Sequence, residues 1–118
     1  MFTYASLEVV SISARTLEPL DALGDPTRRA VFELVVARPR SVAELAAELP
    51  VSRPAVSQHL RVLKEAGLVV DERDGARRCY RLERAGMERL RRYLDGLWGT
   101  ALAAFHDAAV AAAEEGER

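Results

Sequence analysis

A set of polar and basic side chains between Arg53 and Lys64 has the chemistry needed to recognise duplex DNA. Their spacing would place them on one face of a helix, and they are Arg53, Ser57, Gln58, Arg61 and Lys64. A glutamine amide can make a bidentate contact to adenine, and an arginine guanidinium can do the same to guanine. Lysine and arginine also bind phosphate oxygens without reading sequence. The pattern therefore predicts a helix that contacts DNA.

The distribution of charge supports this prediction, although the net charge of the chain is only −1. Residues 53–92 contain eleven basic and six acidic side chains, a local charge of +5, whereas the rest of the chain carries −6. A cationic region on an acidic body attracts a polyanion such as DNA. An ordinary solvated surface of helices and hairpins could produce a similar run, so charge alone does not decide the function.

Two helices are predicted ahead of this region from their start and stop signals. Residues 1–14 show no clear period, and an N-terminal arm is one interpretation of them. A helix is expected from about Thr16 until Gly24 ends it. Asp25 then caps a second helix, with Pro26 in the first helical position, and Pro39 marks its end.

The next two helices would form a helix-turn-helix over residues 42–66. Ser41 and Glu44 have the spacing of a capping box, which opens a short helix over residues 42–49. A second serine cap opens a longer helix over residues 53–66, and the glycine that follows is a typical terminator. The polar face described above lies on this second helix, where a DNA-binding helix-turn-helix carries its recognition residues.

Residues 68–82 predict a β-hairpin, because Asp74-Gly75 is a strong turn signal between two strand-like segments. A two-residue turn at this dipeptide would bring opposite charges together across the strands. It pairs Val69 with Tyr80, Val70 with Cys79, Asp71 with Arg78, and Glu72 with Arg77.

Residues 85–115 are predicted to form one or two C-terminal helices with a wide apolar stripe. Such a stripe exceeds what a small core can cover, and a second copy of the chain is its natural partner. Gly96 and Gly99 each weaken a helix, so they either break the segment or allow close contact at an interface; a kink or break is favoured. The expected dimer contacts are Leu90, Tyr93, Leu94, Leu97, Trp98, Ala101, Leu102 and Phe105.

Four segments together resemble the ArsR/SmtB-type bacterial repressors. They are Leu23–Arg29, Ser41–Ala46, Val51–Val70 and Asp74–Tyr80. The resemblance covers residues 20–82, with a compatible helix after them. It implies a mainly α, winged helix-turn-helix fold with about five helices, a two-stranded hairpin as the wing, and a homodimer formed through the N- and C-terminal helices.

The resemblance also implies which side chains contact double-stranded DNA. Carried over by position, the recognition helix contributes Ser52, Arg53, Pro54, Ser57, Gln58, His59, Arg61 and Lys64, and the wing contributes Arg73, Arg77 and Arg78. Gln58, Arg53 and Arg61 suit base contacts. Lys64 and the three wing arginines suit phosphate contacts.

Metal sensing, for which this family is best known, is not expected here. A thiolate site on the first helix of the motif would require cysteines within residues 44–48, and there are none. A zinc site on the C-terminal helix would have only His106, Asp107 and the terminal Glu114-Glu115 as ligands, which is a poor set. The sequence therefore predicts neither a bound metal nor a cofactor.

Catalysis is also not expected, and the one cysteine has two interpretations. His59 and His106 fall in different elements without a nucleophile or base at a recognisable spacing. Cys79 lies among arginines that would favour its thiolate, so it is a candidate redox sensor. A small apolar residue within the wing is the favoured interpretation. A single cysteine and the lack of a long apolar segment or leader predict a cytoplasmic protein outside the membrane.

The whole of residues 1–118 is interpreted as one winged helix-turn-helix domain that regulates transcription. The expected action is repression by a homodimer bound to an inverted repeat, with half-sites about 10–11 base pairs apart from centre to centre. Activation would follow if the site lay elsewhere in the promoter. The alternatives are a winged helix used for protein–protein contact, or a DNA-binding sensor released by a small molecule, metal or oxidant.

Overall fold

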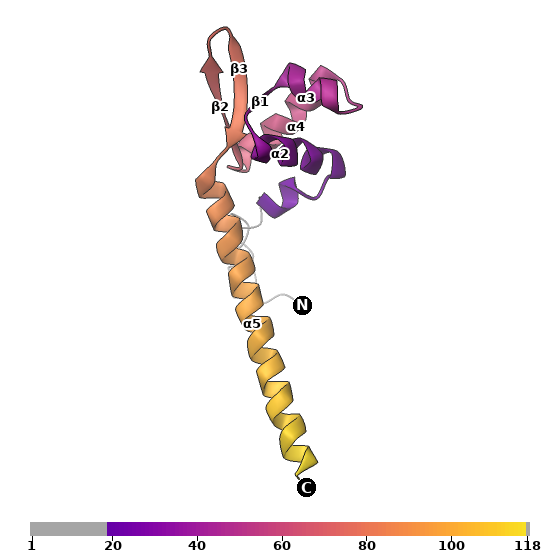
Figure 1. Ribbon diagram of the computed structural model, residues 1–118, viewed down its shortest axis with the longest axis vertical. Coiled ribbons are helices and arrows are strands. Elements are labelled where there is room, and N and C mark those ends of the chain that lie inside the picture. Colours follow the sequence, from indigo (N-terminus) through magenta and orange to yellow (C-terminus); the bar gives the residue numbers. More distant parts are fainter. Residues whose placement is uncertain (1–18, 118) are drawn as a thin grey trace, which may run out of the picture.

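The computed structural model describes residues 19–117, which form a helical head, a small sheet and one long helix (Figure 1). Residues 19–22 are helical. The elements that follow are α2 (Pro26–Ala37), β1 (Arg40–Ser41), α3 (Val42–Glu48), α4 (Arg53–Glu65), β2 (Val69–Asp74), β3 (Arg77–Leu82) and α5 (Arg84–Gly116). The expected arm at residues 1–14 and the helix start near Thr16 lie outside the described residues.

The predicted caps of the head helices are confirmed, and their ends fall within about two residues of the expected ones. The Asp25 side chain accepts a hydrogen bond from the Arg28 N–H at 3.0 Å, which satisfies an amide that α2 itself cannot pair. Ser41 and Glu44 form the reciprocal capping box of α3. Gly67 ends α4 with a φ of 77°, the left-handed conformation that glycine adopts without strain.

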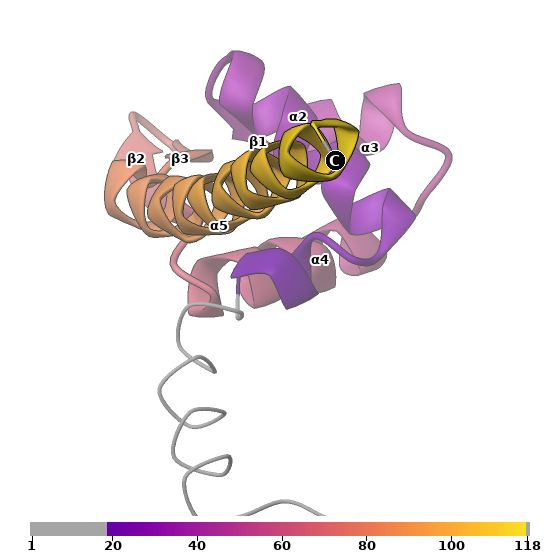
Figure 2. The same cartoon turned by 90° about the horizontal axis from the view of Figure 1, so that it is seen from below.

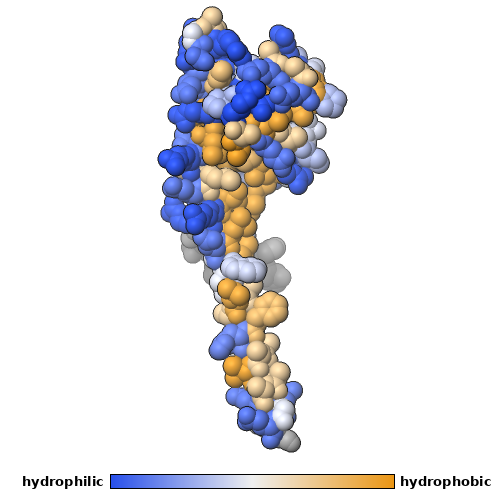
Figure 3. Space-filling model, in the orientation of Figure 1, coloured by the Kyte–Doolittle hydropathy of each residue, from blue (hydrophilic) through white to orange (hydrophobic). Residues whose placement is uncertain are grey.

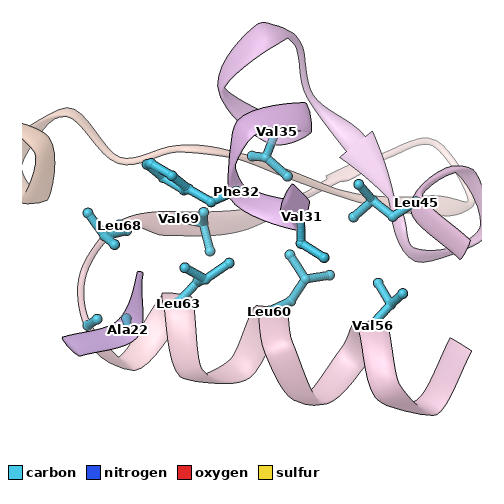
Figure 4. Close-up of a cluster of buried hydrophobic side chains, with 11 residues drawn as sticks. Ala22, Val31, Phe32, Val35, Leu45, Val56, Leu60, Leu63, Leu68 and Val69 are labelled. Carbon is cyan, nitrogen blue, oxygen red and sulfur yellow. The ribbon is translucent and has the colours of Figure 1, made fainter. Parts of the chain in front are cut away.

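The core of the head lies where α2, α3, α4 and β2 meet. Val56, Leu60 and Leu63 project from one side of α4 and are fully buried, because they recur at helical spacing toward the neighbouring elements (Figure 4). Val31 and Val35 of α2 meet them from the opposite side. This packing fixes the orientation of α4 and leaves its other face exposed to solvent.

The predicted two-stranded hairpin is present as β2 and β3, and a third strand that was not predicted, β1, completes a sheet of order β1-β3-β2. The extra strand, β1, pairs Arg40 with Tyr80 and Ser41 with Cys79. A strand of two residues is too short to show the alternation by which strands are recognised in a sequence. Its pairing joins the wing to the residue that caps α3.

The hairpin turn lies one residue later than predicted. Asp74 pairs with Arg77, so the two turn residues are Gly75 and Ala76, with Gly75 at a φ of 66°. Glycine at the first central position is typical of a type II′ turn, whereas the predicted Asp74-Gly75 turn would need a positive φ at Asp74 as well. The four predicted cross-strand pairs are therefore wrong, and their partners lie diagonally. The faces of the strands are unchanged, because partners move by two residues.

Helix α5 runs without interruption over 33 residues, so the favoured break at Gly96 or Gly99 is wrong. Both glycines have open space around the position of a Cβ atom, and neither makes a close backbone contact. The surrounding leucine, arginine and alanine residues are strong helix formers, and they offset a cost of about 1 kcal/mol per glycine.

Helix α5 contacts the head only near its first turns and then extends away from it. Gly86 and Leu90 are buried against the head, and Gly86 lies directly against the backbone of Gly67. Seen from below, α5 runs toward the viewer and away from α2, α3 and α4 (Figure 2). At 1.5 Å per residue its length is about 50 Å. No helix within residues 19–117 combines the length and apolar character needed to cross a membrane.

Candidate nucleic-acid interface

The exposed face of α4 presents the polar residues that the sequence singled out. Ser52, Arg53, Ser57, Gln58, Arg61 and Lys64 are all exposed, as is Pro54 in the first turn. The Ser52 hydroxyl accepts the Ala55 N–H at 3.3 Å and so fixes the start of the helix. Because the opposite face is fully buried, these side chains stand on a rigid support. Neither Arg53 nor Arg61 forms an ion pair with any residue of 19–117, so their charges are available to a ligand.

His59 differs from the other predicted DNA-contacting residues of α4, because its ring is half-buried. Its Nδ1 atom is shielded from solvent and has no hydrogen-bond partner within the described part of the chain. The pKa of Asp25 is lowered chiefly by the Arg28 N–H and to a smaller extent by His59, which places the imidazole near the start of α2. His59 therefore lies at the edge of the exposed face.

Asp71 joins the last turn of α4 to the wing. Its Oδ1 lies 2.7 Å from Lys64 Nζ, and its Oδ2 lies 3.3 Å from an Nη atom of Arg78. The hydrogen bond from Lys64 is the largest of the effects that hold the pKa of Asp71 below its ordinary value. Two residues predicted to bind phosphate are thus brought together by the Asp71 carboxylate. Its charge contact with Arg78 was predicted from the sequence, whereas its contact with Lys64 was not.

Arg77 is separated from this group and lies on the other face of the hairpin. Its guanidinium donates to Glu44 and to the Ser41 hydroxyl, the latter at 3.0 Å. Glu44 also accepts from Arg38 at 3.1 Å. Arg77 therefore attaches the wing to the start of α3. The capping box was visible in the sequence, but the wing arginine that completes it comes from residues far along the chain.

The same contacts predict a pH dependence of stability centred on Glu44. Hydrogen bonds from the Ser41 backbone N–H and then from Arg38 lower the pKa of Glu44 from 4.5 to about 2. A lowered pKa in the folded state stabilises the protein above pH 4.5, and this contribution is lost as the pH falls toward 2. The unfolding midpoint of the wild type in urea should therefore exceed that of Glu44→Gln at pH 7, and the gap should close between these limits.

The matched control is Glu33→Gln on the exposed surface of α2, for which no such closing is expected. A gap between wild type and Glu44→Gln that stays constant as the pH falls from 4.5 to about 2 would contradict the role of the Glu44 charge.

The described residues do not gather ligands as a metal centre would require. Within residues 19–117, no three side chains of His, Cys, Asp or Glu lie close enough together to hold a metal ion. Cys79 is half-buried in β3, between Ser41 of β1 and Glu72 of β2. The cysteine is thus part of the sheet, and it pairs with Glu72 rather than with Val70 as predicted.

Comparison with known proteins agrees with this geometry. Residues 23–72, which span α2 to β2, match the family described as "Helix-turn-helix domain". The HTH-type transcriptional regulator Rv2034 of Mycobacterium tuberculosis is 54% identical over 84 residues, covering 71% of this chain and 78% of that regulator. An ArsR-like transcriptional regulator from Rhodococcus sp. RHA1 is 32% identical with a TM-score of 0.70, covering 85% of this chain and 97% of that one. The chain belongs to the ArsR-type transcriptional regulators.

A further relative is a repressor by name. The HTH-type transcriptional repressor SmtB of Mycobacterium tuberculosis is 46% identical over 65 residues, which is 55% of this ArsR-type regulator and 48% of SmtB. The match is thus confined to about half of the repressor's length. The helix-turn-helix and wing described above give this ArsR-type regulator the elements by which a winged helix contacts DNA.

Proposed function

We propose that this ArsR-type regulator represses transcription as a homodimer that binds an inverted-repeat operator. The exposed polar face of α4, held by a fully buried opposite face, is the observation that carries the proposal. In the complex, α4 enters the major groove and the tip of the β2–β3 hairpin lies on the flanking backbone. Such a protein acts where the chromosome is, in the cytoplasm.

The assignment of roles follows from chemistry and exposure. Arg53, Gln58 and Arg61 contact base edges, because their side chains are long, exposed and carry the donors that base edges accept. Ser52 and Ser57 donate to nearby phosphates, and Lys64, Arg73 and Arg78 add cationic phosphate contacts. Arg77 is already paired with Glu44, so its main role is to hold the wing in place, and a phosphate contact by Arg77 is secondary.

The apolar face of α5 supports the dimer. An apolar strip descends one side of the helix from the head, strongest next to the head and paler toward the C-terminus, with polar residues beside its upper part (Figure 3). Leu97 is 51% exposed, Trp98 66% and Phe105 75%, and a contiguous apolar surface of this kind marks a site of interaction. Leu82, Met87, Leu90 and Leu94 also line a depression of about 450 Å³ at the base of the helix. A second copy would cover this face.

Size and charge favour an antiparallel arrangement of two α5 helices. The first half of the apolar face carries bulky Leu90, Leu94 and Leu97, whereas the second half holds most of the alanines, with Leu102, Phe105 and Val110 among them. Residues 84–95 hold four basic and two acidic side chains, whereas residues 100–117 hold four acidic ones and no Lys or Arg. Antiparallel pairing would place large residues against small ones and opposite charges near each other. A two-fold axis then gives the inverted repeat.

Gln58→Ala is expected to relax the sequence preference rather than abolish binding. A bidentate amide contact is worth about 1–3 kcal/mol of discrimination against the wrong base, which is about 5- to 160-fold in operator affinity for each half-site, and the homodimer loses one such contact in each half-site. Affinity for scrambled duplex should stay within about twofold, because phosphate contacts carry no sequence information. Fluorescence anisotropy on both duplexes measures this, and equal weakening on the two would contradict base contact by Gln58.

The proposal as a whole is tested with the wild-type protein and the DNA upstream of its own gene. Tight binding there, weaker binding to scrambled DNA and a steep loss of affinity between about 50 and 300 mM salt would support a specific DNA-binding regulator. Footprinting should then show two symmetric half-sites. A single asymmetric half-site would contradict the dimer. Failure to bind any DNA at the lowest salt would instead favour a winged helix that contacts another protein.

A further inference from the structure

Two arginines at the tip of the wing face each other directly. Arg73 of β2 and Arg78 of β3 are cross-strand partners, both exposed, on the face of the hairpin that also carries Val69 and Tyr80 and so turns toward the core and α4. Like charges in this position destabilise a hairpin. The arrangement is favourable when an anion lies between or beside the two guanidinium groups.

The structure shows one anion beside the second of these arginines, the carboxylate of Asp71, which contacts Arg78. Asp71 lies two residues before Arg73 on the same face of β2, and its two oxygens hold separate cations, Lys64 and Arg78. The Asp71 side chain is only 15% exposed, whereas those of Lys64 and Arg78 are 54% and 58% exposed. The carboxylate is thus surrounded by cations whose outer sides remain open to solvent.

Basic side chains hold two oxygens of a phosphate group in the same way that Lys64 and Arg78 hold the two oxygens of Asp71. We propose that Asp71 occupies, in the free protein, the place of a DNA backbone phosphate and thereby limits the affinity of the regulator for all DNA. The inference rests on the proposed DNA-binding function. When DNA binds, Lys64 and Arg78 either release the Asp71 carboxylate and contact a phosphate, or contact the carboxylate and the phosphate at the same time.

The consequence of the Asp71 charge is a weaker electrostatic contribution to DNA affinity, with no change in the preference of the regulator for one DNA sequence over another. Asp71 neutralises about one of the cations at the junction of α4 and the wing. Phosphates are the same in every sequence, so affinity for operator and for scrambled DNA falls by the same factor. Such a residue would shorten the time that the regulator spends on non-specific DNA without touching the base contacts of α4.

The test is Asp71→Asn, measured by fluorescence anisotropy on operator and scrambled duplexes from about 50 to 300 mM salt. One additional phosphate contact in each subunit steepens the dependence of log K on log salt by about 0.9 per contact, or about 1.8 for the homodimer, which is about 60-fold in affinity near 0.1 M. We expect this gain on both duplexes, with their affinity ratio unchanged. The gain should disappear when Lys64→Met and Arg78→Met are added to Asp71→Asn.

Glu72→Gln is the matched control. Glu72 is adjacent in β2, lies on the opposite face of the hairpin and pairs with Arg81 at 3.1 Å, so the substitution removes the same charge at a different place. Its effect on DNA affinity should be less than about twofold. An equal gain in Glu72→Gln would show a general effect of net charge and would overturn the proposal.

Asp71→Ser provides a second variant, and unfolding midpoints in urea establish that both variants are folded. Unchanged or weaker DNA binding in folded Asp71→Asn and Asp71→Ser would overturn the proposal; weaker binding would mean that Asp71 orients Lys64 and Arg78 for DNA. If the wild type binds no DNA at the lowest salt, the proposed function itself fails, and this inference fails with it.

Discussion

Gly86→Ala is expected to destabilise the protein by about 3 kcal/mol or more. A Cβ atom at this position would lie 1.9 Å from the carbonyl oxygen of Gly67 and 2.6 Å from its carbonyl carbon. Both are backbone atoms of the turn between α4 and β2, so no side chain can move aside. Either this turn or the start of α5 must shift, and the buried contact of Leu90 would be lost with it. Urea unfolding at a fixed protein concentration measures the effect.

The same substitution further along the helix supplies the control. At Gly96 and Gly99 a Cβ atom would have no neighbouring atom within 4 Å, and helical geometry places both residues on the side of α5 away from the apolar face. Gly96→Ala and Gly99→Ala should each stabilise the protein by up to about 1 kcal/mol, because alanine favours the helix. A Gly86→Ala protein as stable as these two would contradict the close approach of α5 to the head.

Leu97→Glu is expected to convert the proposed dimer to a monomer and to reduce operator affinity by about 100-fold or more. Leu97 lies near the middle of the apolar face of α5, where a second copy would surround it. A carboxylate buried there without a cation is strongly unfavourable. Two linked heads gain about 10²- to 10⁴-fold from binding together, and a monomer loses that gain. Analytical ultracentrifugation and anisotropy on the operator measure the two effects.

Ala103→Glu is its matched control, since residue 103 lies on the opposite side of α5 and is exposed. It adds the same charge and should leave both the dimer and operator binding unchanged. The head makes few contacts with this part of α5, so Leu97→Glu should keep its folded head. A dimer that persists in Leu97→Glu would contradict the proposed interface, whatever the effect on DNA.

The elements of the head could be predicted from the sequence because their signals are local. A cap such as Ser41 with Glu44, or a terminator such as Gly67, acts within four residues of itself. The apolar spacing of Val56, Leu60 and Leu63 likewise identifies the buried side of α4, and by exclusion the side that faces the ligand. The order of the helices and the hairpin, and the polar face of α4, were therefore accessible from the residues alone, whereas the wing arginines were assigned through the resemblance to a known family.

What the sequence did not predict depends on contacts between distant residues or on small differences in energy. The hairpin register depends on whether Gly75 is the first or the second central residue of the turn. Both registers place the same side chains on the same face of each strand, so the apolar pattern does not distinguish them. The two residues of β1, and the contacts of Asp71 and Arg77 with other elements, leave no periodic trace. The continuity of α5 was not predicted, because two exposed glycines weaken a helix without ending it.

Ser41 illustrates how closely the wing and the helix-turn-helix are joined. Its hydroxyl accepts from Glu44 N–H and from Arg77, and its backbone pairs with Cys79 in the sheet. Ser41 thus caps a helix and accepts from a distant arginine with its side chain, and it pairs with a strand through its backbone. Positions 41, 44 and 77 are consequently not free to vary one at a time. Among relatives of this chain they should change together, so that the shape of the head is inherited as a unit while the exposed face of α4 diversifies to recognise new operators.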